Sequence, residues 1–110
     1  MKLTLKKKGE KSVASIKGQL DTLTVPEFQK VLLELIDNGE RKIILDFSEL
    51  DFINTAGLSG ILVLVRRMKL EKGELSAAAL KGQVKKVFDI SGFSSALPIF
   101  DTVSAAAAKT

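Results

Sequence analysis

The segment Asn54-Thr55-Ala56-Gly57 carries the residue types with the clearest chemical use in this sequence. Asn and Thr side chains both cap helices, because their oxygens accept hydrogen bonds from the unpaired N–H groups of the first turn. A hydroxyl at a helix N-terminus also lies where free N–H groups and the positive end of the helix dipole favour an anion. Two interpretations follow: a capped helix in which Gly57 and Gly60 allow close packing, or a Thr55 hydroxyl that accepts a phosphate.

A phosphate on Thr55 would change the surface around it. The unmodified surface is predicted to be neutral and partly apolar, as a protein-docking patch often is, and a phosphate adds a charge of about −1.5 to −2. Ser59 is a second candidate hydroxyl, but it lies about one turn inside the predicted helix, where it would bond the backbone or pack. If Thr55 is a phosphosite, residues 54–57 and the first helical turn should be exposed, with Leu58 or Ile61 facing inward.

The absence of histidine and cysteine excludes many other kinds of chemistry. Zinc sites of the usual His/Cys type, iron–sulfur clusters, thiol nucleophiles, Ser-His-Asp triads and disulfides all need residues that this chain lacks. The carboxylates of Asp21, Asp46 and Asp51 are dispersed and are weak evidence for a metal site. We therefore predict that the protein is not an enzyme and holds no metal or cofactor.

The formal charge of +4 comes from 17 Lys and Arg residues against 13 Asp and Glu residues. Most basic residues fall within amphipathic periods with acids nearby, and Tyr and Trp are absent, so we interpret the charge as a solvated surface and not as a nucleic-acid site. The most apolar stretch, Leu58 to Val65, is much shorter than the about 20 residues that span a membrane. The N-terminus is a charged alternating segment and not an apolar signal region. We expect a cytoplasmic protein without membrane insertion.

Hydrophobic periodicity predicts strands and helices in the first half of the chain. Residues 2–8 and 12–17 are expected to form a β-hairpin. A helix should begin at Thr24-Val25-Pro26-Glu27, where a capping hydroxyl lies three residues before a carboxylate, and should end at Asn38-Gly39. A buried strand is predicted at 42–47, followed by a loop through Leu50 and Phe52-Ile53.

A second helix is predicted to follow Asn54–Gly57 and to end at Lys72-Gly73. Residues 74–80 are compatible with a helix because of their alanines, but their position after a helix favours a strand. A third helix is expected from about Gln83 to Ser91-Gly92, an edge strand at 97–100, and a last helix capped by Asp101. This order predicts one α/β domain over residues 1–110, with a mixed sheet of four to five strands flanked by about four helices.

Three segments occur in an order and spacing found in a known family. The first segment is Ile44-Leu45-Asp46-Phe47, which leads to Phe52-Ile53-Asn54-Thr55-Ala56-Gly57-Leu58. The second is Gly18-Gln19-Leu20-Asp21, which precedes the first predicted helix. The third is residues 84–93, which contain Val84, Phe88 and Ser91-Gly92-Phe93. These segments resemble the STAS domains, in particular the bacterial anti-sigma factor antagonists. The first is similar to the family's strand ending in Leu-Asp, followed by a loop and Asp-Ser-Ser/Thr-Gly-Leu-Gly at a helix start.

The resemblance implies roles for several residues. The family phosphoacceptor directly follows the motif's Asp, and that position is Thr55; Asn54 replaces the Asp and Ala56 the following Ser or Thr. Gly57 and Leu58 match the motif, while Ser59, a secondary acceptor candidate, stands where the family usually has Gly. The resemblance also places Asp21 near the phosphosite; its alternative role is a loop aspartate with local turn hydrogen bonds.

The resemblance further implies a non-enzymatic binding module. Unphosphorylated, it would bind an anti-sigma factor that is itself an ATP-dependent serine/threonine kinase and so free a sigma factor. Phosphorylation of Thr55 would abolish binding, and a serine phosphatase would reset it. ATP belongs to the partner, since this chain has no Gly-x-x-x-x-Gly-Lys-Ser/Thr loop. The alternatives are a STAS scaffold or transport-complex subunit without a switch, which Asn54 and Ala56 favour, and a small-ligand or nucleotide-binding domain.

Overall fold

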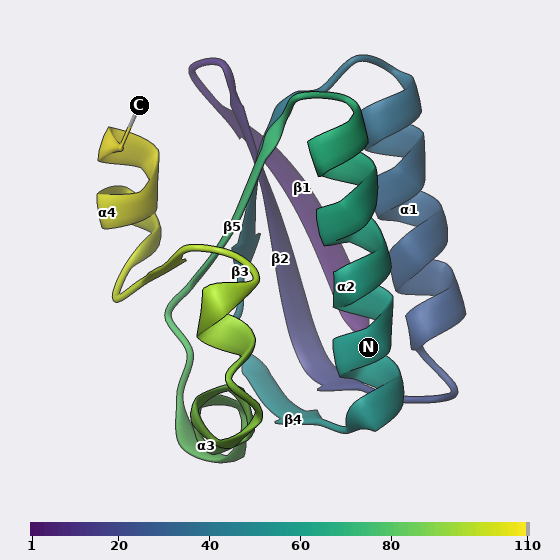
Figure 1. Ribbon diagram of the computed structural model, residues 1–110, viewed down its shortest axis with the longest axis vertical. Helices are drawn as coiled ribbons and strands as arrows, with labels where there is room; N and C mark the ends of the chain where they lie inside the picture. The colour runs from purple at the N-terminus through teal and green to yellow at the C-terminus, as the bar shows by residue number, and fades with distance from the viewer. Residues whose placement is uncertain (110) are drawn as a thin grey trace.

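The computed structural model describes residues 1–109 and shows a mixed sheet flanked by helices (Figure 1). The strands are β1 (Lys2–Lys8), β2 (Lys11–Leu20), β3 (Lys42–Asp46), β4 (Leu50–Ile53), β5 (Glu74–Ala78) and β6 (Ile99–Phe100). The helices are α1 (Val25–Asp37), α2 (Thr55–Leu70), α3 (Gly82–Ser91) and α4 (Val103–Ala108), with a 3-10 turn at Phe93–Ser95. The predicted α/β fold is confirmed.

The strand order is β1-β2-β3-β5-β6, and β4 pairs with β2. Within residues 1–109 only β1 and β2 are antiparallel, as expected of a hairpin, and the other strand pairs there are parallel. The first half of β2 pairs with β3 and its second half with β4, with a register shift at Gly18. Parallel pairing aligns the carboxyl ends of β2 and β4, and this end carries the Asn54–Gly57 segment.

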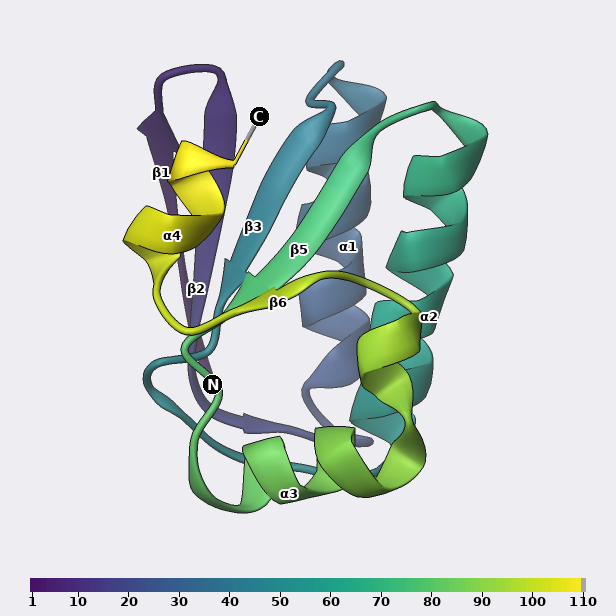
Figure 2. The same ribbon diagram turned by 60° about the vertical axis from the view of Figure 1, so that its left-hand side comes forward.

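The two faces of the sheet are covered unequally. Helices α1 and α2 lie side by side on one face, the short α4 lies on the other, and α3 lies near β4 (Figures 1 and 2). In β3, Ile43 and Leu45 join the main core, while Ile44 packs with a smaller cluster that includes Ala106 of α4. Burial on both faces explains the uninterrupted apolar run of this strand.

Two local predictions were wrong about strand extent. Residues 50–53 form β4 and not a loop, and β2 continues beyond residue 17 to Leu20. Gly18 makes the continuation possible: its φ of +102° suits glycine, and its N–H donates to the Glu49 carbonyl oxygen at 3.0 Å. In β4 the first and last residues are buried and the middle two exposed, so strict alternation is missing from its sequence.

Two predicted caps were also wrong. The Thr24 side chain makes no capping hydrogen bond to α1; its Oγ1 accepts from the Asp21 N–H and donates to the Gln19 carbonyl oxygen, each at 2.9 Å. Helix α4 is capped by Thr102 and not by Asp101, through a 3.0 Å hydrogen bond from the Ala105 N–H to Thr102 Oγ1. Neighbouring oxygen-bearing side chains compete for such positions, and the backbone decides which one reaches the N–H group.

Candidate functional site

The parallel pairing of β2 and β4 brings two loops together. Leu20 and Ile53 are partners at the last position of the pair, and the Asn54 N–H donates to the Leu20 carbonyl oxygen at 3.3 Å. The chain turns away from the sheet directly after each residue, at Asp21 and at Asn54. These two candidate residues therefore lie at neighbouring strand ends.

Asn54, and not Thr55, caps α2. Its Oδ1 accepts from the Gly57 N–H at 3.1 Å, and its extended backbone allows its carbonyl oxygen to accept from the Leu58 N–H at 3.0 Å. Thr55 is the first helical residue and is exposed, so its hydroxyl is left free of the capping role. The capped-helix interpretation thus holds with Asn54 as the cap, and phosphorylation of Thr55 stays a prediction.

Glycines let α2 begin against the sheet. A Cβ on Gly57 would lie 2.4 Å from the Leu20 carbonyl oxygen and 2.6 Å from Ile53 Cγ1. A Cβ on Gly60 would lie 2.5 Å from Val25 Cγ2 of α1. The two glycines therefore set how closely the first turns of α2 approach β2 and α1.

The other candidate residues surround this turn. The expectation that residues 54–57 are all exposed was wrong: Thr55 is exposed, but Asn54 and Ala56 are half-buried and Gly57 is buried. Ser59 is exposed one turn after Thr55, and Leu58 is half-buried. Leu58 packs against the main core, and Ile61 is fully buried. Thr55 and Ser59 therefore face solvent while the apolar side of α2 faces inward.

The Asp21 carboxylate is occupied within its own loop. Its Oδ1 accepts from the Leu23 N–H at 3.0 Å and from the Thr24 N–H at 3.2 Å. Such bonds are typical of an Asx turn, in which the side chain replaces a backbone acceptor. In this structure Asp21 shapes the loop that leads into α1, next to the Thr55 turn.

Gln83 of α3 is a positioning residue that the sequence analysis missed. Its Oε1 accepts from the Ile53 N–H at 3.0 Å, and its Nε2 donates to the Ile53 carbonyl oxygen at 2.8 Å. The side-chain amide thus acts as a one-residue strand partner for the outer edge of β4. A single Gln at a helix start gives no sequence signal for this role, which depends on contacts between distant segments.

Exposed apolar side chains lie on the segments around Thr55. Leu23 of the Asp21 loop is 89% exposed, Phe52 of β4 is 38% exposed, and Val63 of α2 is 43% exposed. Thr55, Ser59 and Val63 follow at intervals of four residues and share one side of α2. The surface at this end therefore combines hydroxyls with apolar groups, which is typical of a protein-docking surface.

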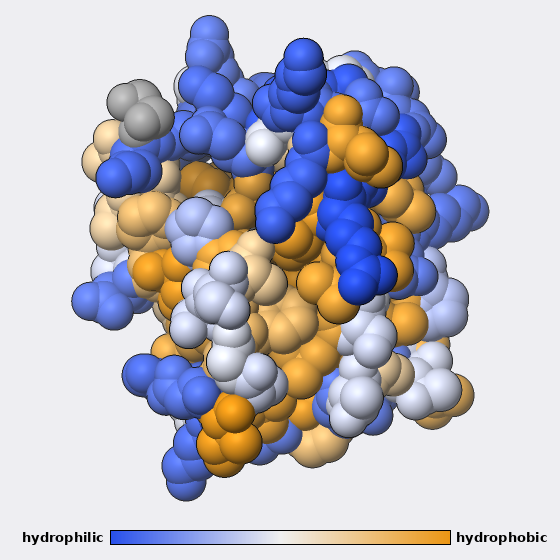
Figure 3. Space-filling model, viewed as in Figure 1, coloured by the Kyte–Doolittle hydropathy of each residue, from blue (hydrophilic) through white to orange (hydrophobic). Residues whose placement is uncertain are grey.

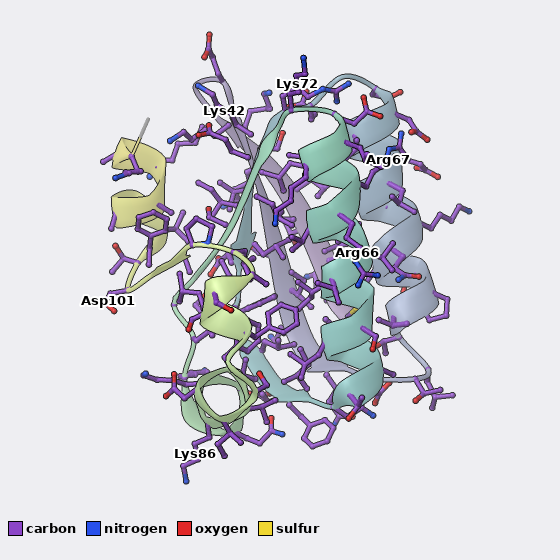
Figure 4. All side chains as sticks on the ribbon, in the orientation of Figure 1. Lys42, Arg66, Arg67, Lys72, Lys86 and Asp101 are labelled. Carbon is purple, nitrogen blue, oxygen red and sulfur yellow. The ribbon has the colours of Figure 1, made fainter. Side chains whose placement is uncertain are left out.

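Charged groups with shifted pKa values lie toward the other end of the helices. Hydrogen bonds to Asp37 and Glu71 raise the pKa of Arg67, which lies near the C-terminal end of α2 (Figure 4). A hydrogen bond from Lys7, and a second from Ser12, lower the pKa of Glu40. The first turn of α2 contains no acidic side chain, so the positive end of its dipole is not offset there.

Residues 1–109 contain no group of three or more acidic side chains that could hold a metal ion, so Asp21, Asp46 and Asp51 do not converge. No helix in this part of the chain has both the length and the apolar character needed to cross a membrane.

Comparisons with known proteins concern the family and the fold of the chain. A family model described as STAS domain matches residues 2–106. A Bordetella bronchiseptica protein named as an anti-sigma factor antagonist, BtrV, is 36% identical over 108 residues, which cover 98% of this chain and 93% of that protein. The crystal structure of a Thermotoga maritima protein described as an anti-sigma factor antagonist has a TM-score of 0.89 at 21% identity, covering 94% of this chain and 90% of that one. Bacillus SpoIIAA in its phosphorylated form has a TM-score of 0.74 at 23% identity, with 96% of each chain covered.

Proposed function

The chain belongs to the STAS domain family, and on that premise we propose that it is an anti-sigma factor antagonist switched by phosphorylation of Thr55. In its unphosphorylated form it binds an anti-sigma factor of the serine/threonine kinase type, and the sigma factor is released. The kinase then phosphorylates Thr55, binding is lost, and a serine phosphatase restores the active form. The observation that carries the proposal is the exposed, non-capping hydroxyl at the first position of α2.

The position of Thr55 supports phosphorylation by another protein. A kinase must reach the acceptor oxygen, and Thr55 is exposed on a turn that Asn54, Gly57 and Gln83 hold in place. Because Asn54 supplies the cap, modification of Thr55 removes no hydrogen bond that begins the helix. The acceptor is therefore available without local unfolding.

The electrostatics of the turn support a stable phosphorylated state. A phosphate at the first residue of α2 would lie near free N–H groups and the positive end of the helix dipole. Asn54 contributes no negative charge beside the acceptor, and the first turn has no acidic residue. The fold should therefore accept the phosphate.

The surrounding surface explains how a phosphate would end binding. Leu23 and Phe52 present apolar area on either side of the turn, and burying such area favours association. A phosphate buried in that interface would have to lose its hydration, and residues 54–58 contain no basic side chain to pair with it, which opposes association. The switch thus acts on the partner surface and not on the fold.

The test uses the purified full chain and the kinase-type anti-sigma factor of the same organism. Wild type, Thr55→Ala, Thr55→Glu and Ser59→Ala are incubated with this partner and ATP, and phosphate incorporation is measured by intact mass. The same variants are titrated against the partner without ATP. We expect wild type and Ser59→Ala to gain one phosphate, Thr55→Ala to gain none but to bind, and Thr55→Glu to bind more weakly.

Three results would contradict the proposal in different ways. Equal phosphate incorporation in wild type and Thr55→Ala would move the acceptor elsewhere, with Ser59 the first alternative. Binding of the anti-sigma factor without phosphate incorporation in any variant would leave an antagonist without a switch. Absence of binding would favour the scaffold or transport-complex subunit that the substitutions Asn54 and Ala56 suggested.

A further inference from the structure

A second surface feature lies at the opposite end of α2 from Thr55. A cavity of about 310 Å³ lies between the C-terminal half of α2, the first part of β5 and α4. In the space-filling view it is an apolar hollow between α4 and α2, with hydrophilic side chains above it (Figure 3). The cavity is separate from the docking surface proposed above and uses none of its residues.

The cavity exists because β5 is only partly covered. Strand β6 pairs with β5 at Ala77 and Ala78 alone, so among the described residues no strand lies beside the first part of β5 on this side. Glu74, Leu75 and Ser76 line the cavity there. Helix α4 is short and packs mainly over Val13, Ile44 and Ala78.

The lining is apolar at one end and cationic at the other. Strands β2, β3 and β5 are parallel, so their first residues, Lys11, Lys42 and Glu74, gather at one end of the sheet and line the cavity there. Lys69 of α2 contributes to the same wall. Figure 4 shows Lys42 at this upper end. The deeper lining is formed by apolar side chains of several elements: Ile43, Ile44, Val65, Met68, Leu75 and Phe100.

The charges at the cationic end favour an anion. The described lining contains four lysines, Lys11, Lys42, Lys69 and Lys109, against the single acid Glu74. Lys11 is buried, and its Nζ donates to the carbonyl oxygens of Ala106 and Ala107, at 3.2 and 2.8 Å. Lys42 Nζ lies 3.7 Å from Glu10 Oε2. Lys69 and Lys109 are exposed at the rim. A net positive rim above an apolar floor complements a molecule with an anionic head and a hydrocarbon body.

The open edge of β5 is too short to bind an extended peptide. The Glu74 N–H donates toward β3, at Arg41, while the Ala77 N–H donates toward β6, at Pro98. Since N–H directions alternate along a strand, Leu75 is the one residue of the uncovered part whose N–H points outward. Strand addition relies on several main-chain hydrogen bonds, so the geometry favours a compact ligand.

We propose that this cavity binds a small amphipathic carboxylate, a hydrocarbon chain of medium length with one anionic head. The head would lie between Lys69 and Lys109, and the chain would extend toward Phe100. The cavity volume lies at the lower end of the range of small-molecule sites. Such a ligand buries its chain and keeps its carboxylate at the solvated, positive rim.

The experiment is a two-dimensional amide NMR titration of the intact chain with monomeric decanoate. We expect saturable shifts at Leu75, Ser76 and Ala106 and none at Asn54 or Thr55. Octanoate should bind more weakly, by about fourfold for each methylene removed. Decanol and decyltrimethylammonium, which have neutral and cationic heads, should bind at least tenfold more weakly than decanoate.

Variants separate the site from general charge effects. Lys69→Glu should weaken decanoate binding about tenfold or more, while Lys86→Glu, which makes the same charge change on α3 outside the cavity, should leave it unchanged (Figure 4). Ser76→Leu should weaken binding by filling the lining without removing a lysine. Equal losses in Lys69→Glu and Lys86→Glu, or no saturable shifts with decanoate, would overturn the proposal. The same would follow if raising the protein concentration alone shifted these amides, because a second copy of the chain would then occupy the cavity.

Discussion

Gly57→Ala tests whether the close approach of α2 to β2 determines the geometry of the Thr55 turn. The added Cβ would lie 2.4 Å from the Leu20 carbonyl oxygen, whereas ordinary contacts begin at 3.4 Å, so about 1 Å of movement is required. The obstacle is a backbone atom of a paired strand, which cannot rotate away. The start of α2 must therefore move outward, or the pairing of Leu20 with Ile53 must loosen.

The expected cost follows from two opposing effects. Overpacking a well-packed site costs about 1–3 kcal/mol, and the backbone obstacle places Gly57→Ala in the upper part of that range. Replacing glycine with alanine inside a helix stabilises the helix by up to about 1 kcal/mol. We expect the free energy of unfolding to fall by about 1–2 kcal/mol, together with slower phosphate incorporation at Thr55.

Gly60→Ala is the matched control within the same helix. Its Cβ would meet a side-chain methyl of Val25 at 2.5 Å, and Val25 is half-buried and can adjust. The same gain in helix propensity applies, so the net change should lie within about 1 kcal/mol of zero. Adding Val25→Ala should relieve the contact, giving a favourable coupling of at least about 0.5 kcal/mol in a double-mutant cycle.

The assay is urea unfolding monitored by far-ultraviolet circular dichroism, since the chain has no Trp or Tyr whose fluorescence could report unfolding. Each variant is compared with wild type using one common slope of unfolding free energy against urea concentration. Wild-type stability in Gly57→Ala, or a larger loss in Gly60→Ala than in Gly57→Ala, would refute the reasoning that the backbone contact with Leu20 fixes the turn.

Three further predictions concern single contacts. Asn54→Ala should lower the free energy of unfolding by about 1 kcal/mol and Thr55→Ala by less than about 0.5 kcal/mol, both measured by urea unfolding; the reverse order would mean that Thr55 is the cap. Gln83→Ala should lower the free energy of unfolding by about 1–2 kcal/mol, because it removes two hydrogen bonds to Ile53. It should also speed hydrogen exchange of the Ile53 amide, and an unchanged exchange rate would contradict the role of Gln83. Because the pKa of Glu40 is lowered from 4.5 by Lys7 and Ser12, its stabilising effect should be complete above about pH 4.5 and lost as the pH falls through the lowered value. The stability gap between wild type and Glu40→Gln, measured across pH, should therefore close in acid, and a gap that widens there would show that the sign is wrong.

The sequence allowed the alternating elements to be predicted where periodicity was strong. The apolar face of α1, the uninterrupted run Ile43–Leu45 and the left-handed Gly92 at the end of α3 are local signals, and each marks an element in the structure. Strand β4 was missed because only its end residues, Leu50 and Ile53, are buried, and because it forms by pairing with a distant strand. Local propensity carries no information about such a partner.

The position of the turn at the start of α2 was predictable, but the roles of Asn54 and Thr55 within it were not. Asn54 and Thr55 are both capping types, and only the extended backbone of Asn54 shows which one reaches the Gly57 N–H. The contributions of Gln83 and of the Leu20 carbonyl oxygen could not be predicted, because both arise from contacts across elements. The lysine-rimmed cavity likewise depends on how far β6 extends along β5.

The divided pairing of β2 has a consequence for the order in which the chain assembles. The β1–β2 hairpin closes over Gly9 and Glu10, so it needs no later part of the chain. The other strand pairs of the described residues join positions more than 20 residues apart and must first overcome loop-closure entropy. The Thr55 turn depends on β4 joining β2, and β4 is in turn held by Gln83 from far along the sequence. During synthesis, the turn therefore reaches its final form only after most of the chain has emerged, and N-terminal fragments that stop before α3 should leave it unformed.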